Sequence, residues 1–93
     1  MIRTFQCVKT ERLWNRVRVK EFESIATVAL RRLTALDSAQ ALADLLVPPG
    51  NRLEALQGDR QGQHSIRIND QYRICFTWKE ENPHDVEITR HYR

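Results

Sequence analysis

The sequence has little glycine, little cysteine and no long apolar run. Three glycines in 93 residues leave no room for a glycine-rich loop of the kind that wraps a nucleotide phosphate. The best apolar run, residues 41–47, contains Asp44 and falls well short of the roughly 18 residues that a membrane span needs. The N-terminus turns polar early and lacks the apolar segment of a secretory signal. We therefore expect a cytoplasmic protein with no cofactor and no membrane association.

The cysteines and histidines are too scattered for a metal site. Cys7 and Cys75 lie far apart without a Cys-x-x-Cys spacing, which favours free thiols over a disulfide or a ligand pair. His64, His84 and His91 do not follow the spacing of a structural zinc site either. We therefore expect no bound metal.

Arginine is the residue type that stands out. The apolar fraction of 41% and the charged fraction of 29% are ordinary for a globular protein, and the length predicts a single domain over residues 1–93. Of the 15 basic residues, 12 are arginines, and the formal net charge is +3. Guanidinium groups bind phosphate with two hydrogen bonds and stack on bases. The bias favours a nucleic-acid partner, although arginine-rich codon usage produces the same composition.

Helical periodicity dominates the first half of the chain. Large apolar residues recur at spacings of three and four between positions 22 and 36, which predicts one amphipathic helix over residues 19–37. Pro48, Pro49 and Gly50 then end helical structure and force a loop. The shorter elements expected in this half are a strand over residues 1–5, a helix over 10–16 and a helical turn over 41–46.

The second half of the chain is expected to form a sheet. The predicted strands span residues 52–56, 63–68, 72–79 and 85–92. Helices followed by strands are typical of an α+β domain, in which one face of the sheet packs against the long helix.

Alternation of apolar and polar residues fixes the register of the two central strands. Ile66 and Ile74 both face the core only if their strands are joined by three residues, 69–71. This register sets Arg67 directly opposite Arg73 on the solvent face. Like charges paired across a sheet are mildly destabilising, so we expect an anionic group on that face.

The last strand is expected to pair with the strand before it through a five-residue loop, 80–84. The core-facing pairs in this register are Val86 with Trp78 and Ile88 with Phe76. The same register sets Lys79 opposite Asp85 and brings His91 beside Arg73. The solvent face then also carries Arg67 and, at the end of the strand, Tyr92 and Arg93.

This face has residues suited to RNA cleavage. The 2′-hydroxyl of RNA can attack its own phosphodiester when a cation stabilises charge on the phosphate and another group moves protons. Arg73 suits the first role and His91 the second. Alternatively, the exposed arginines are solvated or are paired with carboxylates such as Glu54 or Glu87. The sequence shows no Ser/His/Asp triad and no paired-carboxylate site.

A long motif resembles a known family. The stretch PPGNRLEALQGDRQGQHSIRINDQYRICFTW at residues 48–78 resembles the HigB branch of the RelE/ParE toxin superfamily. MIRTF at 1–5, ALD at 35–37 and VEI at 86–88 extend the resemblance over essentially the whole chain. It implies N-terminal helices packed on one face of a twisted, mostly antiparallel sheet. It also implies a metal-independent endoribonuclease that cuts mRNA in the ribosomal A site.

The resemblance implies partners and site residues as well. A HigA-like helix-turn-helix antitoxin would bind and silence the protein, and operator DNA would be bound only through that antitoxin. Arg73 matches the family's strand arginine, and Arg60 matches a basic loop position. Glu54 stands where some relatives carry a histidine, and it would be either a base or a structural residue. Family members commonly end in Asp-Tyr-His. This chain has Arg90, His91 and Tyr92 at those positions when they are counted from VEI, and His91, Tyr92 and Arg93 when they are counted back from the C-terminus.

The candidate residues fall into two groups. The candidate catalytic residues are Arg73, His91, Tyr92 and Glu54, and the candidate RNA- or ribosome-binding residues are Arg67, Arg60, His64, Arg90 and Arg93. A hydrogen-bonded structural role is the alternative for His64. Two alternatives to mRNA cleavage remain at this stage: a ParE-like toxin that binds gyrase, and a weak relative that acts as an antitoxin corepressor on operator DNA.

Overall fold

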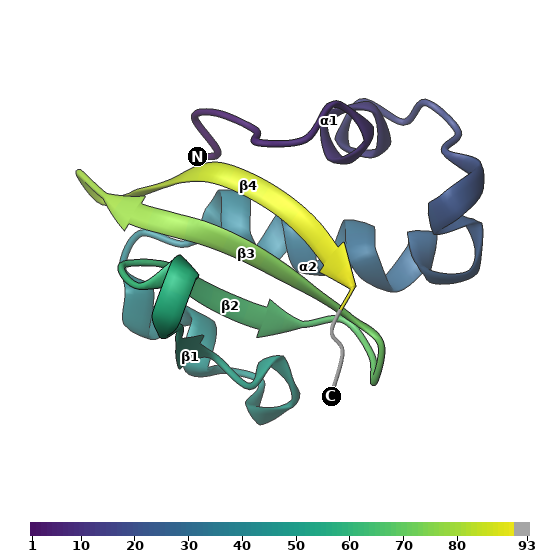
Figure 1. The fold of residues 1–93 in the computed structure, drawn as a ribbon. Helices are drawn as coiled ribbons and strands as arrows, with labels where there is room; N and C mark the ends of the chain where they lie inside the picture. The colour runs from purple at the N-terminus through teal and green to yellow at the C-terminus, as the bar shows by residue number, and fades with distance from the viewer. Residues whose placement is uncertain (91–93) are drawn as a thin grey trace.

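Helices fill the first half of the chain and a sheet fills the second half, which confirms the expected α+β class (Figure 1). The computed structural model describes residues 1–90. Its helices and 3₁₀ helices are α1 (Val8–Trp14), η1 (Lys20–Ile25), α2 (Ala26–Ser38), η2 (Leu42–Leu46), η3 (Pro49–Asn51) and η4 (Gly58–Arg60). Its strands are β1 (Glu54–Ala55), β2 (His64–Arg67), β3 (Tyr72–Lys79) and β4 (Asn82–Arg90). Within this range no helix has the length and apolar character needed to cross a membrane.

The predicted long helix is two elements rather than one. The chain winds as the 3₁₀ helix η1 up to Ile25, where the backbone dihedrals (φ −115°, ψ 0°) depart from those of a regular α-helix before α2 begins. Residues three apart share one side of a 3₁₀ helix, so Phe22 and Ile25 both point into the core. The apolar spacing was therefore right about the buried face and wrong about the continuity of the helix.

The expected strand at residues 1–5 is also wrong. The N-terminal segment makes a single parallel bridge, between Phe5 and Val86. Hydrogen bonds join the N–H of Gln6 to the carbonyl of Val86 and the N–H of Val86 to the carbonyl of Thr4, both at 3.0 Å. Beside this bridge Asp85 has a left-handed backbone (φ 52°), a conformation that regular strand pairing does not contain.

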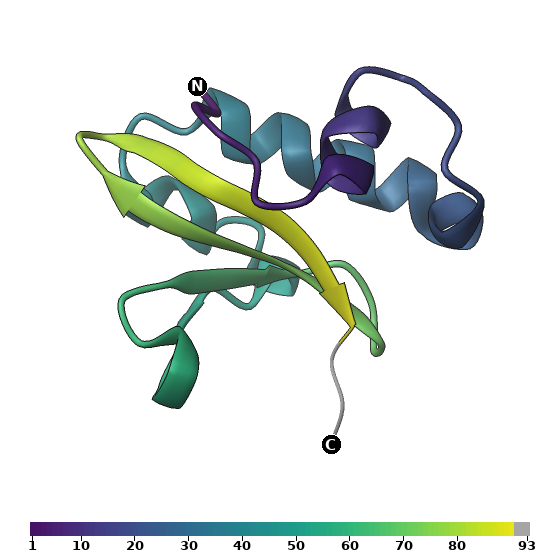
Figure 2. The same cartoon turned by 45° about the horizontal axis from the view of Figure 1, so that its top comes forward.

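The sheet is antiparallel throughout, with strand order β1-β2-β3-β4. The predicted register of the central strands is confirmed, because Ile66 pairs with Ile74 and Arg67 pairs with Arg73. α2 runs across one face of the sheet, and α1 lies alongside β4 (Figures 1 and 2). The opposite face, which we call the open sheet face, is turned toward the viewer in Figure 1.

The predicted register of β4 is wrong by two residues beside Arg73. Thr89 lies opposite Arg73, and Lys79 lies opposite Asn82 rather than Asp85. The connection is a tight turn at Glu80 and Glu81, both with left-handed backbones (φ 53° and 63°), in place of a five-residue loop. A bulge between Cys75 and Thr77 then shifts the pairing. The predicted core pairs of Val86 with Trp78 and Ile88 with Phe76 are replaced by Pro83 with Trp78 and Ile88 with Ile74.

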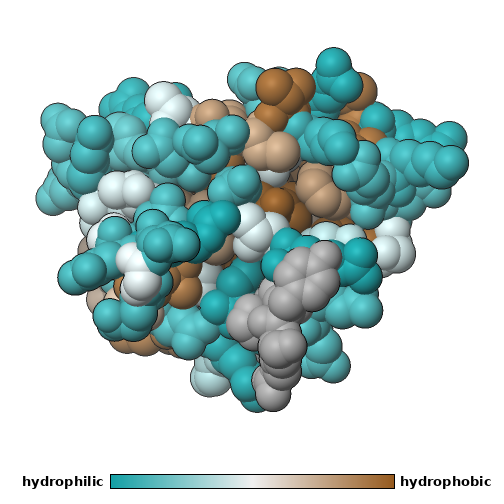
Figure 3. Space-filling model, in the orientation of Figure 1, coloured by the Kyte–Doolittle hydropathy of each residue, from teal (hydrophilic) through white to brown (hydrophobic). Residues whose placement is uncertain are grey.

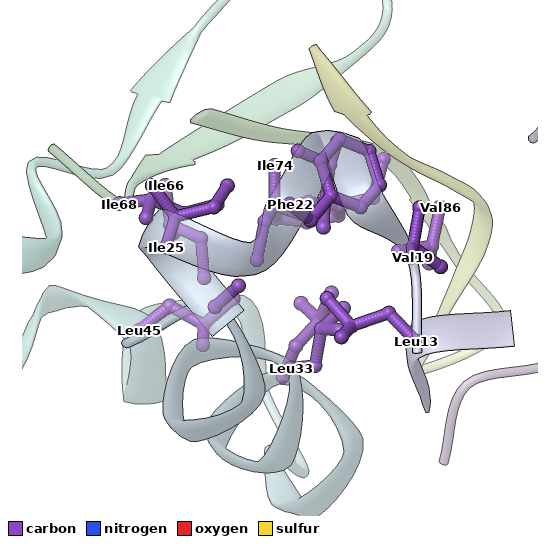
Figure 4. Close-up of a cluster of buried hydrophobic side chains, with 14 of the residues drawn as sticks. Leu13, Val19, Phe22, Ile25, Leu33, Leu45, Ile66, Ile68, Ile74 and Val86 are labelled. Carbon is purple, nitrogen blue, oxygen red and sulfur yellow. The ribbon is translucent and has the colours of Figure 1, made fainter. Parts of the chain in front are cut away.

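The core lies between α2 and the covered face of the sheet. Leu33 of α2, Ile66 of β2 and Ile74 of β3 are fully buried, and Figure 4 shows side chains of the helical layer meeting those of the strands. α1 is joined to the sheet by a buried hydrogen bond, in which the N–H of Ile88 donates to Thr10 Oγ1 at 3.0 Å. This packing makes the sheet a rigid support for the side chains on its open face.

Candidate active site on the open sheet face

The open sheet face is a polar surface with an arginine pair at one end. Arg67, Arg73 and Thr89 form one row across β2, β3 and β4. Glu54, Ser65, Cys75 and Glu87 form the neighbouring row across all four strands. Side chains seen from this side are mostly hydrophilic, whereas apolar ones gather toward α1 (Figure 3). The twisted sheet therefore presents charged groups on its open face (Figure 2).

Arg73 is held by an ion pair with Glu54. Its Nη1 donates to Glu54 Oε1 at 2.5 Å, and the two side chains are 20% and 51% exposed. Glu54 of β1 lies opposite Ser65 of β2, and Ser65 lies opposite Cys75 of β3. Cys75 is two residues from Arg73 along β3, so Glu54 reaches Arg73 across β2. The structure thus brings together Arg73 and Glu54, two of the four predicted catalytic residues. They form the arginine–carboxylate pair that the sequence analysis gave as an alternative.

Arg67 is neutralised separately from Arg73. Its guanidinium pairs with Asp70, in the turn that joins β2 to β3. Its backbone carbonyl accepts a hydrogen bond from Arg32 Nε of α2 at 3.0 Å, which ties the strand to the helical layer. The like-charge pair predicted across the sheet therefore exists, and each arginine has its own carboxylate. Pairing with carboxylates is the alternative stated above for these exposed arginines, and Glu54 is one of the two carboxylates named there.

Arg60 lies at the opposite end of the same face. From η4, its Nη1 donates to Gln63 Oε1 at 2.9 Å and its Nη2 contacts Glu87 Oε1 at 3.2 Å. Beside these residues is a cleft that Gln6 and Asp59 also line. Gln6 was not identified from the sequence as a site residue. Its place on the open sheet face follows from alternation along the chain. Phe5 pairs with Val86 on the core side, so the next residue, Gln6, faces the opposite way.

Small side chains lie between the Arg67–Arg73 pair and Arg60 on the open sheet face. Ser65 and Cys75 are each 1% exposed, and Cys75 Sγ lies 3.5 Å from Thr89 Oγ1. Sequence reasoning did not single out Ser65 or Thr89, although both follow from alternation along their strands. Because these residues are small, the longer arginine and glutamate side chains around them project further from the sheet, where a ligand can contact them.

Two predicted RNA-binding residues lie on the other side of the sheet. His64 is two residues before the buried Ile66, so it shares the core side, and its ring stacks on Phe76 with centroids 6.2 Å apart. Arg90 pairs with Tyr72 across the strands and places its guanidinium 5.7 Å from the Tyr72 ring. The structure therefore separates His64 and Arg90 from the row that contains Arg73.

Three predicted site residues are not placed. His91, Tyr92 and Arg93 lie outside the described residues. The predicted register set His91 beside Arg73, and Thr89 occupies the paired position instead. Within residues 1–90, His, Cys, Asp and Glu side chains do not gather in groups of three or more that could hold a metal ion.

The chain matches one toxin family and is similar to two known proteins. Residues 8–91 match the family described as RelE-like toxin of type II toxin-antitoxin system HigB. Toxin HigB-1 of Vibrio cholerae is 53% identical over 55 residues, and an uncharacterized protein of Haemophilus influenzae is 30% identical over 64. These alignments cover 59% and 69% of this chain, and 58% and 63% of the two relatives.

A solved structure has the same fold. It is described as the YoeB-YefM complex from Staphylococcus aureus, and the matched chain superposes with a TM-score of 0.60 at 17% identity. The match covers 99% of this chain and 99% of that one. The fold agrees with the family match over residues 8–91. The chain therefore belongs to the HigB-like family of RelE-like toxins from type II toxin-antitoxin systems.

Proposed function

We propose that this toxin is a ribosome-dependent endonuclease that cleaves mRNA without a metal ion. The observation that carries the proposal is the Arg73–Glu54 pair on the open sheet face, with a second arginine directly opposite. The Arg73 guanidinium can stabilise negative charge on a phosphate, and the neighbouring Glu54 carboxylate can accept a proton. The family to which the chain belongs supplies the biological setting of a toxin-antitoxin pair.

Arg73 is proposed to stabilise the phosphate in the transition state. The RNA 2′-oxygen attacks phosphorus, and the bond from phosphorus to the 5′-oxygen breaks, leaving a 2′,3′-cyclic phosphate and a 5′-hydroxyl end. Negative charge builds on the non-bridging oxygens during this step. A guanidinium has five N–H donors, so Arg73 can keep one on Glu54 while others bind phosphate oxygens.

Glu54 is proposed to accept the proton of the attacking 2′-hydroxyl. Its carboxylate contacts Arg73, so it lies beside any phosphate that Arg73 binds. The leaving 5′-oxygen needs a proton in return, and His91 or Tyr92 is proposed to donate it. Arg67, opposite Arg73, and Arg60, at the far end of the face, are proposed to bind neighbouring phosphates or ribosomal RNA.

The proposed partners follow from this activity. The ribosome would present the message, which explains how a small domain with few binding groups acts on mRNA. A HigA-like helix-turn-helix antitoxin is proposed to bind the toxin and silence it, and operator DNA is proposed to be reached only through that antitoxin. His64, Arg90 and Arg93 are proposed only as candidates for ribosome contact. His64 and Arg90 lie on the other side of the sheet, and Arg93 lies outside the described residues.

Expression in cells tests the proposal. Wild-type protein should arrest growth and deplete messages, whereas Arg73→Ala should do neither while remaining folded, since substitutions on a surface change stability little. Arg18→Ala is the matched control, because it removes another exposed ion pair, with Glu23, from the helical layer. Growth arrest with DNA damage and intact messages would contradict mRNA cleavage and point to gyrase. The absence of arrest would point to a corepressor.

A further inference from the structure

We infer that a polar cleft one row of side chains from Arg73 selects guanine next to the scissile phosphate, an assignment that rests on the proposed function. The η4 cleft is lined by Gln6, Asp59, Arg60, Gln63 and Glu87. These residues come from the N-terminal segment, η4, the position just before β2, and β4, and they meet on the open sheet face. The proposed reaction uses none of them for its chemistry.

Strand register places the η4 cleft one row of side chains from Arg73. Thr89 lies opposite Arg73, and Glu87 lies opposite Cys75 in the next row. Side chains on one face of a strand are two residues apart, which is roughly 6.6–6.8 Å along the strand. A nucleoside joined to a phosphate at Arg73 therefore has Glu87 within reach of its base.

Arg60 fixes two hydrogen-bonding side chains in this cleft. It donates to Gln63 Oε1 at 2.9 Å and to Glu87 Oε1 at 3.2 Å. The Glu87 side chain is only 25% exposed, so its carboxylate is held against the sheet. In the part of the chain that the structure describes, the second oxygen of Glu87 and the side-chain amide of Gln6 make no hydrogen bond. Pre-positioned groups with free hydrogen-bonding capacity are what recognition of an unstacked base requires.

Guanine is the base whose Watson–Crick edge matches a carboxylate. It presents two adjacent donors, N1–H and the N2 amino group, next to the acceptor O6. The Glu87 carboxylate can accept from both donors, while the amide of Gln63 or Gln6 donates to O6. Adenine sets its acceptor N1 beside its only amino donor, and uracil and cytosine each present one donor with two acceptors. Each of these three bases would place an acceptor against the carboxylate.

Mapping of cut sites on ribosomes tests this assignment. A message that contains every codon is translated with purified wild-type protein or Glu87→Gln, and the 5′ ends are mapped by primer extension. Wild-type cuts should favour guanine over adenine at one fixed position by about tenfold, a modest value for a bidentate base contact. In Glu87→Gln this ratio should fall to near one, because an amide presents one donor and one acceptor and suits adenine as well.

A matched control separates base selection from a general loss of activity. Glu81→Gln makes the same chemical change in the β3–β4 turn, away from the cleft, and should keep the wild-type preference. Thermal unfolding of each variant checks that the fold is intact. Equal guanine preference in wild type and Glu87→Gln would overturn the assignment, and so would wild-type cutting with no preference at that position.

A binding assay keeps the assignment testable if the proposed function fails. Short RNA oligonucleotides with 2′-O-methyl groups cannot be cleaved, and they can differ in a single base. Guanine should bind more tightly than inosine, which lacks the N2 amino group, and more tightly than adenine, and Glu87→Gln should remove both differences. This result without ribosomal cleavage would refute only the proposed function, whereas equal affinities would refute the guanine subsite.

Discussion

Replacement of Glu54 by glutamine should strengthen RNA binding and slow cleavage at the same time. Glu54 Oε1 lies 2.5 Å from Arg73 Nη1, so its charge competes with an incoming phosphate for the guanidinium. The Glu54 side chain is 51% exposed, and a pair of this kind is worth roughly 0.2–1 kcal/mol. Removing the competing charge should therefore tighten binding by about the same free energy, at most roughly fivefold, with a similarly small effect on stability.

The effect of Glu54→Gln on the rate should be much larger. An amide cannot take the proton of the 2′-hydroxyl, and loss of a general base slows a reaction by roughly 10²–10⁴-fold. Single-turnover cleavage on ribosomes should show a lower maximal rate together with half-saturation at a lower protein concentration. Glu23→Gln, which breaks the exposed pair with Arg18, serves as the control and should change neither quantity. An unchanged maximal rate would refute the role of Glu54 as the base, and weaker binding would refute its competition with phosphate.

Three further changes test the fold through the free energy of unfolding, measured with urea. Phe76→Ala should lower it by about 3–5 kcal/mol, because Phe76 is completely buried, and a loss below 1 kcal/mol would contradict the core described above. Thr10→Val should lower it by about 1–3 kcal/mol, since the buried N–H of Ile88 would lose its acceptor; an unchanged value would show that water replaces the hydroxyl. Glu80→Asn combined with Glu81→Gly should raise it by about 1 kcal/mol without loss of toxicity, because these residues suit the left-handed turn, and destabilisation would contradict that turn.

Alternation predicted the β2–β3 register because large apolar residues alternate with polar ones in this part of the sequence. Only a connection of three residues satisfies Ile66 and Ile74 together, and the structure has that pairing. The register of β4 escaped prediction because a shift of two residues leaves every apolar side chain on the core face. The turn at Glu80 and Glu81 also lacks the asparagine and glycine that normally mark a tight hairpin.

The sequence predicted on which face Arg73 lies, but it did not settle which side chains contact Arg73. Its place on the solvent face followed from the alternation of β3 alone. The choice of Glu54 as its partner depends on β1, which has only two residues and almost no periodic signal. The η4 cleft depends on the same kind of long-range contact, since Arg60 reaches Glu87 across 27 positions. Contacts of this kind are set by packing of the whole chain and not by local pattern.

The most direct test of the central claim is in vitro translation of a defined message with purified protein. Wild-type protein and Arg73→Ala are compared with and without ribosomes, and 5′ ends are mapped by primer extension. Cuts should require ribosomes, persist when divalent metal ions other than the Mg²⁺ needed by the ribosome are removed, and vanish in Arg73→Ala. Intact message with wild-type protein, or equal cutting by a folded Arg73→Ala variant, would contradict that claim.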